Sequence, residues 1–424
     1  MIRFLFKGVI RDRNRSVLPI IVVSIGVFLT VLFQSWLTGI MGESIEFNAN
    51  FSTGHVKILT NGYEKNINQR PNDLALMDIK SINNDLKTNY PEIQWVERIL
   101  FGGLIDVPDK NGETRVQGTT TGFGIDLFSE NSDELQRLNI KKSLKKGSIP
   151  KNPGEILISK NFANKLKVGI GDKVTFIGSS MYGELSMYNF RIAGMVEFGT
   201  TILDKGAIIV DITDIRKALD MKNATSEILG FFKTGYFDQE KSEEIIATYN
   251  KINNDSTDIF SPKMLSLRDQ NEMGMFVDFS SKISAIITFV FVIIMSLILW
   301  NAGLLGGLRR YGEFGVRLAI GEEKKHIYKT LIYESVLVGI IGSVIGTMVA
   351  LVLAYYLQEK GLDVSSFTKN ATIMLPSVYK ARITTETFYI GFLPGVISTV
   401  LGSMLSGIGI YKRKTAQLFK ELET

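Results

Sequence analysis

Four long apolar stretches divide the chain, and a long mixed segment separates the first from the second. Each stretch is long enough to cross a bilayer, because about 20 predominantly apolar residues span it as a helix. The mixed segment alternates short apolar runs with charged and turn-forming residues, as a soluble domain does. The pattern therefore predicts a membrane α-helical protein with four transmembrane helices plus a large α+β domain. The predicted spans are 17–41, 273–305, 331–357 and 388–411, and the domain is 42–272.

Within the domain, short strands and helices follow one another. The Asn111-Gly112 pair predicts a hairpin turn, and residues 47–63 read as a strand that ends at another Asn-Gly pair. Asp211 or Thr213 would cap a helix that begins there. We expect a strand-rich inserted subdomain at about 151–201. The flanking segments, about 43–150 and 202–272, would form a mixed subdomain nearer the membrane.

Basic residues set the expected orientation. They concentrate in 1–16, 306–330 and 412–424, and by the positive-inside rule these segments are cytoplasmic. Residues 43–282 carry a net charge of −4 and the rest +9, against +5 for the whole chain. The excess basic charge thus indicates topology and argues against a nucleic-acid-binding face. The domain and the loop 358–387 are then extracytoplasmic, and both termini are cytoplasmic. Residues 1–16 are expected to form an interfacial helix, with a plain basic leader as the alternative.

The segment 306–330 joins the second and third spans and is the candidate coupling segment. Arg310, Glu313 and Arg317 fall at helical spacing, so their charges can pair along one face. An apolar ridge of Phe314, Val316, Leu318 and Ile320 would lie beside them on a short helix ended by Gly321. A solvated basic loop is the alternative. The candidate residues are Arg309, Arg310, Glu313, Phe314, Gly315, Arg317, Leu318, Gly321, Lys324 and Lys325.

Glycines are closely spaced in the third and fourth spans. Small residues let helices approach closely in lipid, where packing drives association. The candidate packing residues are Gly339, Gly342, Gly346, Gly395 and Gly402, which either pack within the chain or line a moving interface. Glu334 lies inside the third span, where an ionisable group needs a partner; Lys329 and Arg310 are the candidates.

Catalytic and metal chemistry find no support. The chain has no cysteine, and His55 and His326 are its two histidines, on opposite sides of the predicted membrane. The carboxylates near the Asn111-Gly112 turn fit a solvated hairpin. No G-x-x-x-x-G-K-[ST] loop is present. We expect a non-catalytic chain that binds no metal or cofactor.

The stretch RRYGEFGVRLAIGEEKKHIYKTLIYESVLVGIIGSVIG resembles the permease signature of MacB/FtsX-type (type VII) ABC transporters. It departs from that signature at Glu322, where the family usually has Ala, and at Leu318, often Ala. Residues 51–56, 154–176 and 190–219 resemble the outside domain of the lipoprotein-releasing Lol-type (LolC/LolE-like) branch. The matching signature positions are Arg310, Glu313, Gly315, Arg317, Gly321, Glu334, Gly342 and Gly346.

The resemblance implies a permease subunit in the bacterial inner membrane. A separate cytosolic ABC ATPase dimer would hold ATP and Mg, and a second permease copy, identical or a sibling, would complete the transporter. By mechanotransmission, ATP hydrolysis would move the outside domains and release lipoproteins from the membrane to a carrier. Two alternatives remain: export of periplasmic peptides, toxins or drugs with an adaptor, and FtsX-like regulation of cell-wall hydrolases.

Overall fold

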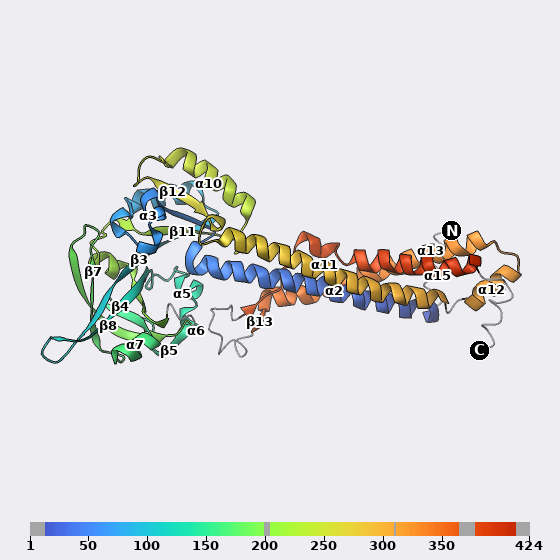
Figure 1. Cartoon of the computed structure of the whole chain (residues 1–424), viewed down its shortest axis with the longest axis horizontal. Coiled ribbons are helices and arrows are strands. Elements are labelled where there is room, and N and C mark those ends of the chain that lie inside the picture. Colours follow the sequence, from blue (N-terminus) through green and yellow to red (C-terminus); the bar gives the residue numbers. More distant parts are fainter. Residues whose placement is uncertain (1–12, 199–203, 309–310, 364–377, 413–424) are drawn as a thin grey trace. The chain divides into compact units, whose positions relative to one another are not determined.

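The computed structural model describes residues 13–198, 204–308, 311–363 and 378–412 (Figure 1), and the chain divides into two compact units. The helical unit comprises Met1–Glu43, Asp278–Val364 and Ser377–Thr424. The described residues of the sheet unit belong to Ser44–Val277. The predicted interfacial helix at 1–16 and the tail at 412–424 lie almost wholly outside the described residues.

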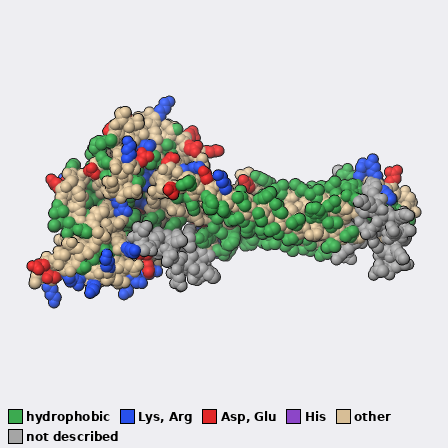
Figure 2. Space-filling view, in the orientation of Figure 1, with side chains coloured by type: hydrophobic (Ala, Val, Ile, Leu, Met, Phe, Trp, Pro, Cys, Tyr) green, Lys and Arg blue, Asp and Glu red, His purple; other side chains and the backbone are tan. Residues whose placement is uncertain are grey.

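Four helices of the described chain are long and apolar enough to cross a membrane, which confirms the predicted number of spans. Hydrophobic side chains cover the visible surface of these helices (Figure 2). The least buried of them is α11. In its most apolar 18-residue stretch 17% of the residues are buried, against 33–39% in the corresponding stretches of the other three helices. The helices and strands here are α2 Arg13–Asn48, α11 Met273–Leu308, α12 Tyr311–Ala319, α13 Lys324–Lys360, β13 Leu362–Asp363, β14 Val378–Tyr379, η5 Thr385–Phe388, η6 Leu393–Ser398 and α15 Thr399–Lys412.

Helix lengths differ from the predicted spans. Both α2 and α11 have 36 residues, about 54 Å at 1.5 Å per residue, whereas the hydrocarbon layer is about 30 Å thick. Hydropathy marks only the apolar part of α2, so its polar continuation beyond residue 41 was not predicted. Similarly, α13 begins at Lys324, inside the segment assigned to coupling. The fourth span begins irregularly with the π-helix η6, where Pro394 lacks a backbone N–H.

The sheet unit is built on one ten-stranded sheet (Figure 1). Its order is β12-β1-β11-β3-β4-β9-β6-β8-β5, and β7 pairs with β3 and β8. The β4–β9 and β6–β8 pairs are parallel. The strands are β1 Val56–Thr60, β3 Ile93–Pro108, β4 Thr114–Ile125, β5 Leu144–Gly147, β6 Glu155–Ser159, β7 Lys173–Ser179, β8 Leu185–Val196, β9 Ala207–Asp211, β11 Glu227–Phe232 and β12 Pro262–Ser266.

Short helices and one small two-stranded pair, β2 with β10, complete the unit. Asp211 accepts a hydrogen bond from the Thr213 backbone N–H, so it is the helix cap that the sequence left open between two residues. The elements are η1 Ala49–Thr53, α3 Asn61–Lys65, η2 Ile67–Gln69, η3 Asn72–Leu74, β2 Leu76–Met77, α4 Ile79–Asn89, α5 Glu134–Arg137, α6 Ile140–Ser143, α7 Lys160–Leu166, α9 Ile212–Ala218, β10 Ala224–Thr225, α10 Gln239–Asn253 and η4 Leu267–Asp269.

The long strand β3 belongs to both halves of the sheet. Its first half, Ile93 to Arg98, pairs with β11, and its second half, from Ile99, pairs with β4 and then β7. Three buried clusters follow this division: one contains residues of β1, β11 and α4, and the other two contain residues of β6, β8 and β9. The strands β4, β5 and β9 lie outside the predicted subdomain at about 151–201, yet they share a sheet and buried side chains with β6 and β8.

The segment 47–63 also differs from its prediction. The chain stays helical to Asn48, continues as the π-helix η1, and becomes extended only at Val56. Gly54 makes the change of direction, with φ at +62°. The Asn61-Gly62 pair opens α3 rather than forming a turn after the strand, and the Thr60 hydroxyl caps that helix. In contrast, β3 and β4 form the hairpin predicted at Asn111-Gly112.

Candidate coupling site

The coupling segment folds as the nine-residue helix α12, a turn and the start of α13. Phe314 is buried and packs against Ile327 and Leu331 of α13, with Leu318 beside it. Gly321 ends the helix in the left-handed region, at φ +98°, a conformation that favours glycine. These contacts fix α12 on the beginning of α13.

The predicted apolar ridge is divided between two sides of α12. Phe314 and Leu318 face α13, whereas Val316 and Ile320 are exposed, Ile320 to 80%. Residues two apart on a helix are about 200° apart. One ridge could therefore not contain all four residues. The exposed pair leaves an apolar strip on the outer side of this segment.

One charge pair of this segment was not predicted, and Arg310 of the predicted set lies outside the described residues. Arg317 binds Glu322, across the turn, through Nε–Oε2 at 2.6 Å and Nη2–Oε1 at 2.5 Å. This hydrogen bond from Arg317 is the main reason that the pKa of Glu322 lies below its usual value. Glu322 is one of the two residues, with Leu318, at which the sequence departs from the signature that it resembles. The sequence signal for this pair is an arginine and a carboxylate five residues apart, because arginine often binds a carboxylate through two parallel hydrogen bonds.

The other candidate residues of the segment differ in their exposure, and two of them are not described. Arg309 and Arg310 lie outside the described residues. Gly315 is buried, Glu313 and Lys324 are half-buried, and Lys325 is exposed. Glu334 is half-buried within α13. The structure therefore brings Phe314, Leu318, Arg317 and Gly321 together around one turn.

The predicted packing glycines contact neighbouring helices of the same chain. A Cβ at Gly346 would lie 2.5 Å from the Ser24 carbonyl oxygen of α2, and one at Gly342 would lie 2.7 Å from Val23. Gly339 instead faces η6, where its Cβ would lie 3.0 Å from the Gly395 carbonyl oxygen. The three glycines thus serve two interfaces rather than one.

The remaining two glycines behave in the same way. Gly395 faces Ser343 and Val27, and a Cβ at Gly402 would lie 2.5 Å from the Trp300 carbonyl oxygen of α11. Each of the five predicted positions therefore allows close packing against another segment of the helical unit.

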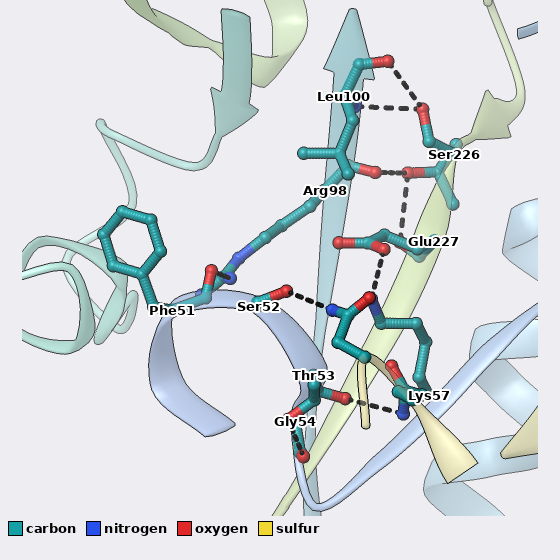
Figure 3. Close-up of polar contacts among 12 residues, drawn as sticks. Phe51, Ser52, Thr53, Gly54, Lys57, Arg98, Leu100, Ser226 and Glu227 are labelled. Atoms are coloured by element: carbon teal, nitrogen blue, oxygen red, sulfur yellow. Dashed lines mark hydrogen bonds and ion pairs between the residues drawn. The ribbon is translucent and has the colours of Figure 1, made fainter. Parts of the chain in front are cut away.

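A second polar site, which the sequence did not indicate, holds η1 in the sheet unit (Figure 3). Arg98 is buried and extends from β3 to η1, where Nη1 donates to the Phe51 carbonyl at 2.9 Å and Nη2 to the Asn50 carbonyl at 2.7 Å. Arg98 also binds the buried Glu134 of α5, with Nε–Oε2 at 2.7 Å. One guanidinium thus joins three segments.

Two more groups hold the end of α2 and η1. Arg137 donates to the Asn50 side-chain oxygen at 3.2 Å, and burial lowers the pKa of its guanidinium while Glu134 opposes that shift. Glu46 binds His55 Nε2 at 2.7 Å and accepts a hydrogen bond from the Phe237 backbone N–H at 2.6 Å. His55 Nδ1 accepts from the Phe232 N–H at 3.0 Å, so its Nε2 carries the proton that Glu46 accepts.

Comparison with known proteins identifies the family. Residues 16–245, more than half of the chain, match the model of the MacB-like periplasmic core domain. Residues 285–415 match the FtsX-like permease C-terminal model. Two curated relatives are the lipoprotein-releasing system transmembrane proteins LolC of Xylella fastidiosa strains Temecula1 and 9a5c. Each is 22% identical over 250 residues, which cover 57% of this chain and 58% of the relative.

A solved structure has a weaker likeness: the periplasmic region of MacB from Actinobacillus actinomycetemcomitans, at 11% identity and a TM-score of 0.37. The match covers 53% of this chain and 94% of that one. The family and the four candidate spans indicate a membrane protein of the bacterial inner membrane. On the two family models, the chain belongs to the MacB/FtsX-type ABC transporter permeases, near their Lol-type branch.

Proposed function

We propose that this chain is the permease subunit of an ABC transporter, and that a separate cytosolic ATPase supplies the energy. The family of the chain supports this proposal. The single structural observation that carries it is an exposed apolar strip on the outer side of α12, formed by Val316 and Ile320. The strip lies next to the hydrogen-bonded ion pair of Arg317 and Glu322. A short helix with one face packed on its own chain and an apolar outer face suits docking into a groove of a partner.

The ATPase would bind ATP and Mg, and this chain would bind neither. Docking would place Val316 and Ile320 in the groove, with the Arg317–Glu322 pair at its rim. The transporter would contain two permeases, identical or siblings, and an ATPase dimer. The basic segments 306–330 and 412–424 would face the cytoplasm, as the positive-inside rule requires, and the sheet unit would lie on the other side.

For the cargo, we propose lipoproteins released from the inner membrane by movements of the sheet units. The names of the two LolC relatives support this choice, although the chain spans about 58% of their length. Depletion of the protein should then leave outer-membrane lipoproteins in the inner membrane. Normal lipoprotein sorting after depletion would refute this cargo and favour export of peptides, toxins or drugs.

The docking role is tested with two matched substitutions. Ile320→Asp places a charge in the strip on α12, and Ile252→Asp does so on α10, where the isoleucine is 76% exposed. With the ATPase that co-purifies in mild detergent, Ile320→Asp should weaken binding at least tenfold, since a charge buried in a groove is costly. Ile252→Asp should bind as the wild type does. Equal binding by both variants would refute docking through this strip.

A further inference from the structure

The end of the first long helix is fixed to one point of the sheet. Helix α2 is followed directly by η1, and Arg98 donates to the carbonyls of Asn50 and Phe51 within η1. These carbonyls lie near a helix end, where intrahelical donors run out. Arg137 adds a contact to the Asn50 side chain. Two guanidinium groups therefore hold the same short segment.

Arg98 occupies a special position on β3. It is the last residue of β3 that pairs with β11, and Ile99 is the first that pairs with β4. The Arg98 carbonyl also accepts a hydrogen bond from the Thr225 hydroxyl, just before β11. A displacement of η1 passed through the Arg98 side chain would thus reach the strand that both halves of the sheet share.

A gain in the free energy of unfolding does not explain why Arg98 and Glu134 are buried as a charged pair. Arg98 and Glu134 are each about 1% exposed. The desolvation of such a pair offsets most of its attraction, so that apolar residues of similar size often stabilise a fold equally well. What apolar residues would lack is the directed hydrogen bonding to Asn50 and Phe51, which fixes the position of η1 relative to β3.

We propose that Arg98, oriented by Glu134, is a positioning residue that couples movement of the first membrane helix to both halves of the sheet. This inference rests on the proposed function, because it assumes that ATP hydrolysis moves α2. It adds the contact through which that movement would reach the sheet unit. Loss of the Arg98 contacts to η1 should leave ATP hydrolysis intact and uncouple it from release of cargo.

The test compares two double variants of the full chain. Arg98→Met with Glu134→Gln removes the Arg98 contacts to η1 together with both charges of the pair, and Arg137, which also lies near Glu134, keeps Asp133 at 3.8 Å. Lys57→Met with Glu227→Gln makes the same kind of change in another buried pair of this sheet, whose Nζ–Oε2 distance is 2.7 Å. The polar contacts that the structure gives Lys57 and Glu227 do not include Asn50 or Phe51, so the second variant is the matched control (Figure 3).

Two measurements follow. In the purified chain without nucleotide, hydrogen exchange of residues 49–53 should become at least tenfold faster in the Arg98 variant and change less than twofold in the control. In the reconstituted complex with its ATPase, lipoprotein released per ATP hydrolysed should fall at least tenfold in the Arg98 variant alone, with hydrolysis within twofold of wild type.

Unchanged exchange at 49–53, or an equal loss of release in both variants, would overturn the inference while wild-type release stays normal. A wild-type complex that releases no cargo with ATP would refute the proposed function, and the inference with it. Thermal unfolding of each variant shows whether it folds. If the double variant fails to fold, Arg98→Lys replaces it, since lysine keeps the charge but loses the forked contacts to both carbonyls, and it should reproduce both changes at smaller size.

Discussion

Close contact between α13 and α2 at Gly346 gives a sharp prediction for the helical unit. In Gly346→Val, the new Cβ would lie 2.5 Å from the Ser24 carbonyl oxygen and 2.9 Å from the Val27 Cβ. Separations this short require a shift, and the Ser24 oxygen belongs to helix backbone, so the two helices must separate. The matched control is Gly306→Val in α11, where a Cβ would meet no atom within 4 Å.

The magnitude follows from the size of the clash. Overpacking of a well-packed interior costs about 1–3 kcal/mol, and the helix propensities of Val and Gly differ by only a few tenths of a kcal/mol. For a folding unit of roughly 150–250 residues, each kcal/mol shifts the Tm by about 2–4 °C. Gly346→Val should therefore lower the Tm by about 2–12 °C, and Gly306→Val should change it by less than about 2 °C.

Thermal unfolding in mild detergent, followed by tryptophan fluorescence at one fixed heating rate, measures this difference. A fixed rate matters because unfolding of membrane proteins is often irreversible, and the apparent Tm then depends on the scan. If Gly346→Val and Gly306→Val unfold within 1 °C of each other, the close packing of α13 on α2 does not stabilise the unit, and the interpretation of these glycines is wrong.

Three further predictions concern other parts of the chain. Burial, and to a lesser extent the charge of Glu227, raises the pKa of the Tyr63 phenol above its ordinary value of 10. The stability that the neutral phenol contributes is therefore complete below pH 10. Above pH 10 the free energy of unfolding falls by about 1.4 kcal/mol per pH unit. Tyr63→Phe should therefore flatten the alkaline fall in the free energy of unfolding measured between pH 10 and 11; a slope equal to that of wild type would contradict the assignment. Arg317→Glu should weaken coupling to the ATPase by placing two carboxylates at the turn, and Glu322→Arg added to it should restore at least half of the stimulated ATPase rate; no recovery would show that the pair does not order α12. Reporter fusions after Gln358 should report the outside and those after Thr424 the cytoplasm, and the reverse result would invert the topology.

Much of the fold follows from local patterns. The four spans, the hairpin at Asn111-Gly112 and the end of α12 near Gly321 depend on hydropathy over one stretch or on the backbone of one glycine. Such signals need no knowledge of distant contacts. The same is true of the packing glycines, whose spacing indicates close approach of helices even before the partner helix is known.

The parts that the sequence did not predict depend on partners far apart in the chain. Glu134 is 36 residues from Arg98, and neither residue stands in a recognisable motif. The pairing of β3 with β11 along its first half and with β4 and β7 along its second half is not encoded in the pattern of any one strand. The end of α2 was missed because residues beyond 41 are polar enough to leave the bilayer yet remain helical.

The low burial of α11 has a consequence for the energy of movement. A helix that shares little surface with its neighbours loses little packing when it shifts. Sliding α11 against the other spans therefore requires less work than moving the more buried α13, although α11 also meets α15 closely at Gly402. Its first residues, Met273 and Val277, are nevertheless buried in the sheet unit. Among the four spans, α11 is thus the one whose position thermal fluctuations and the surrounding lipid composition should change most readily.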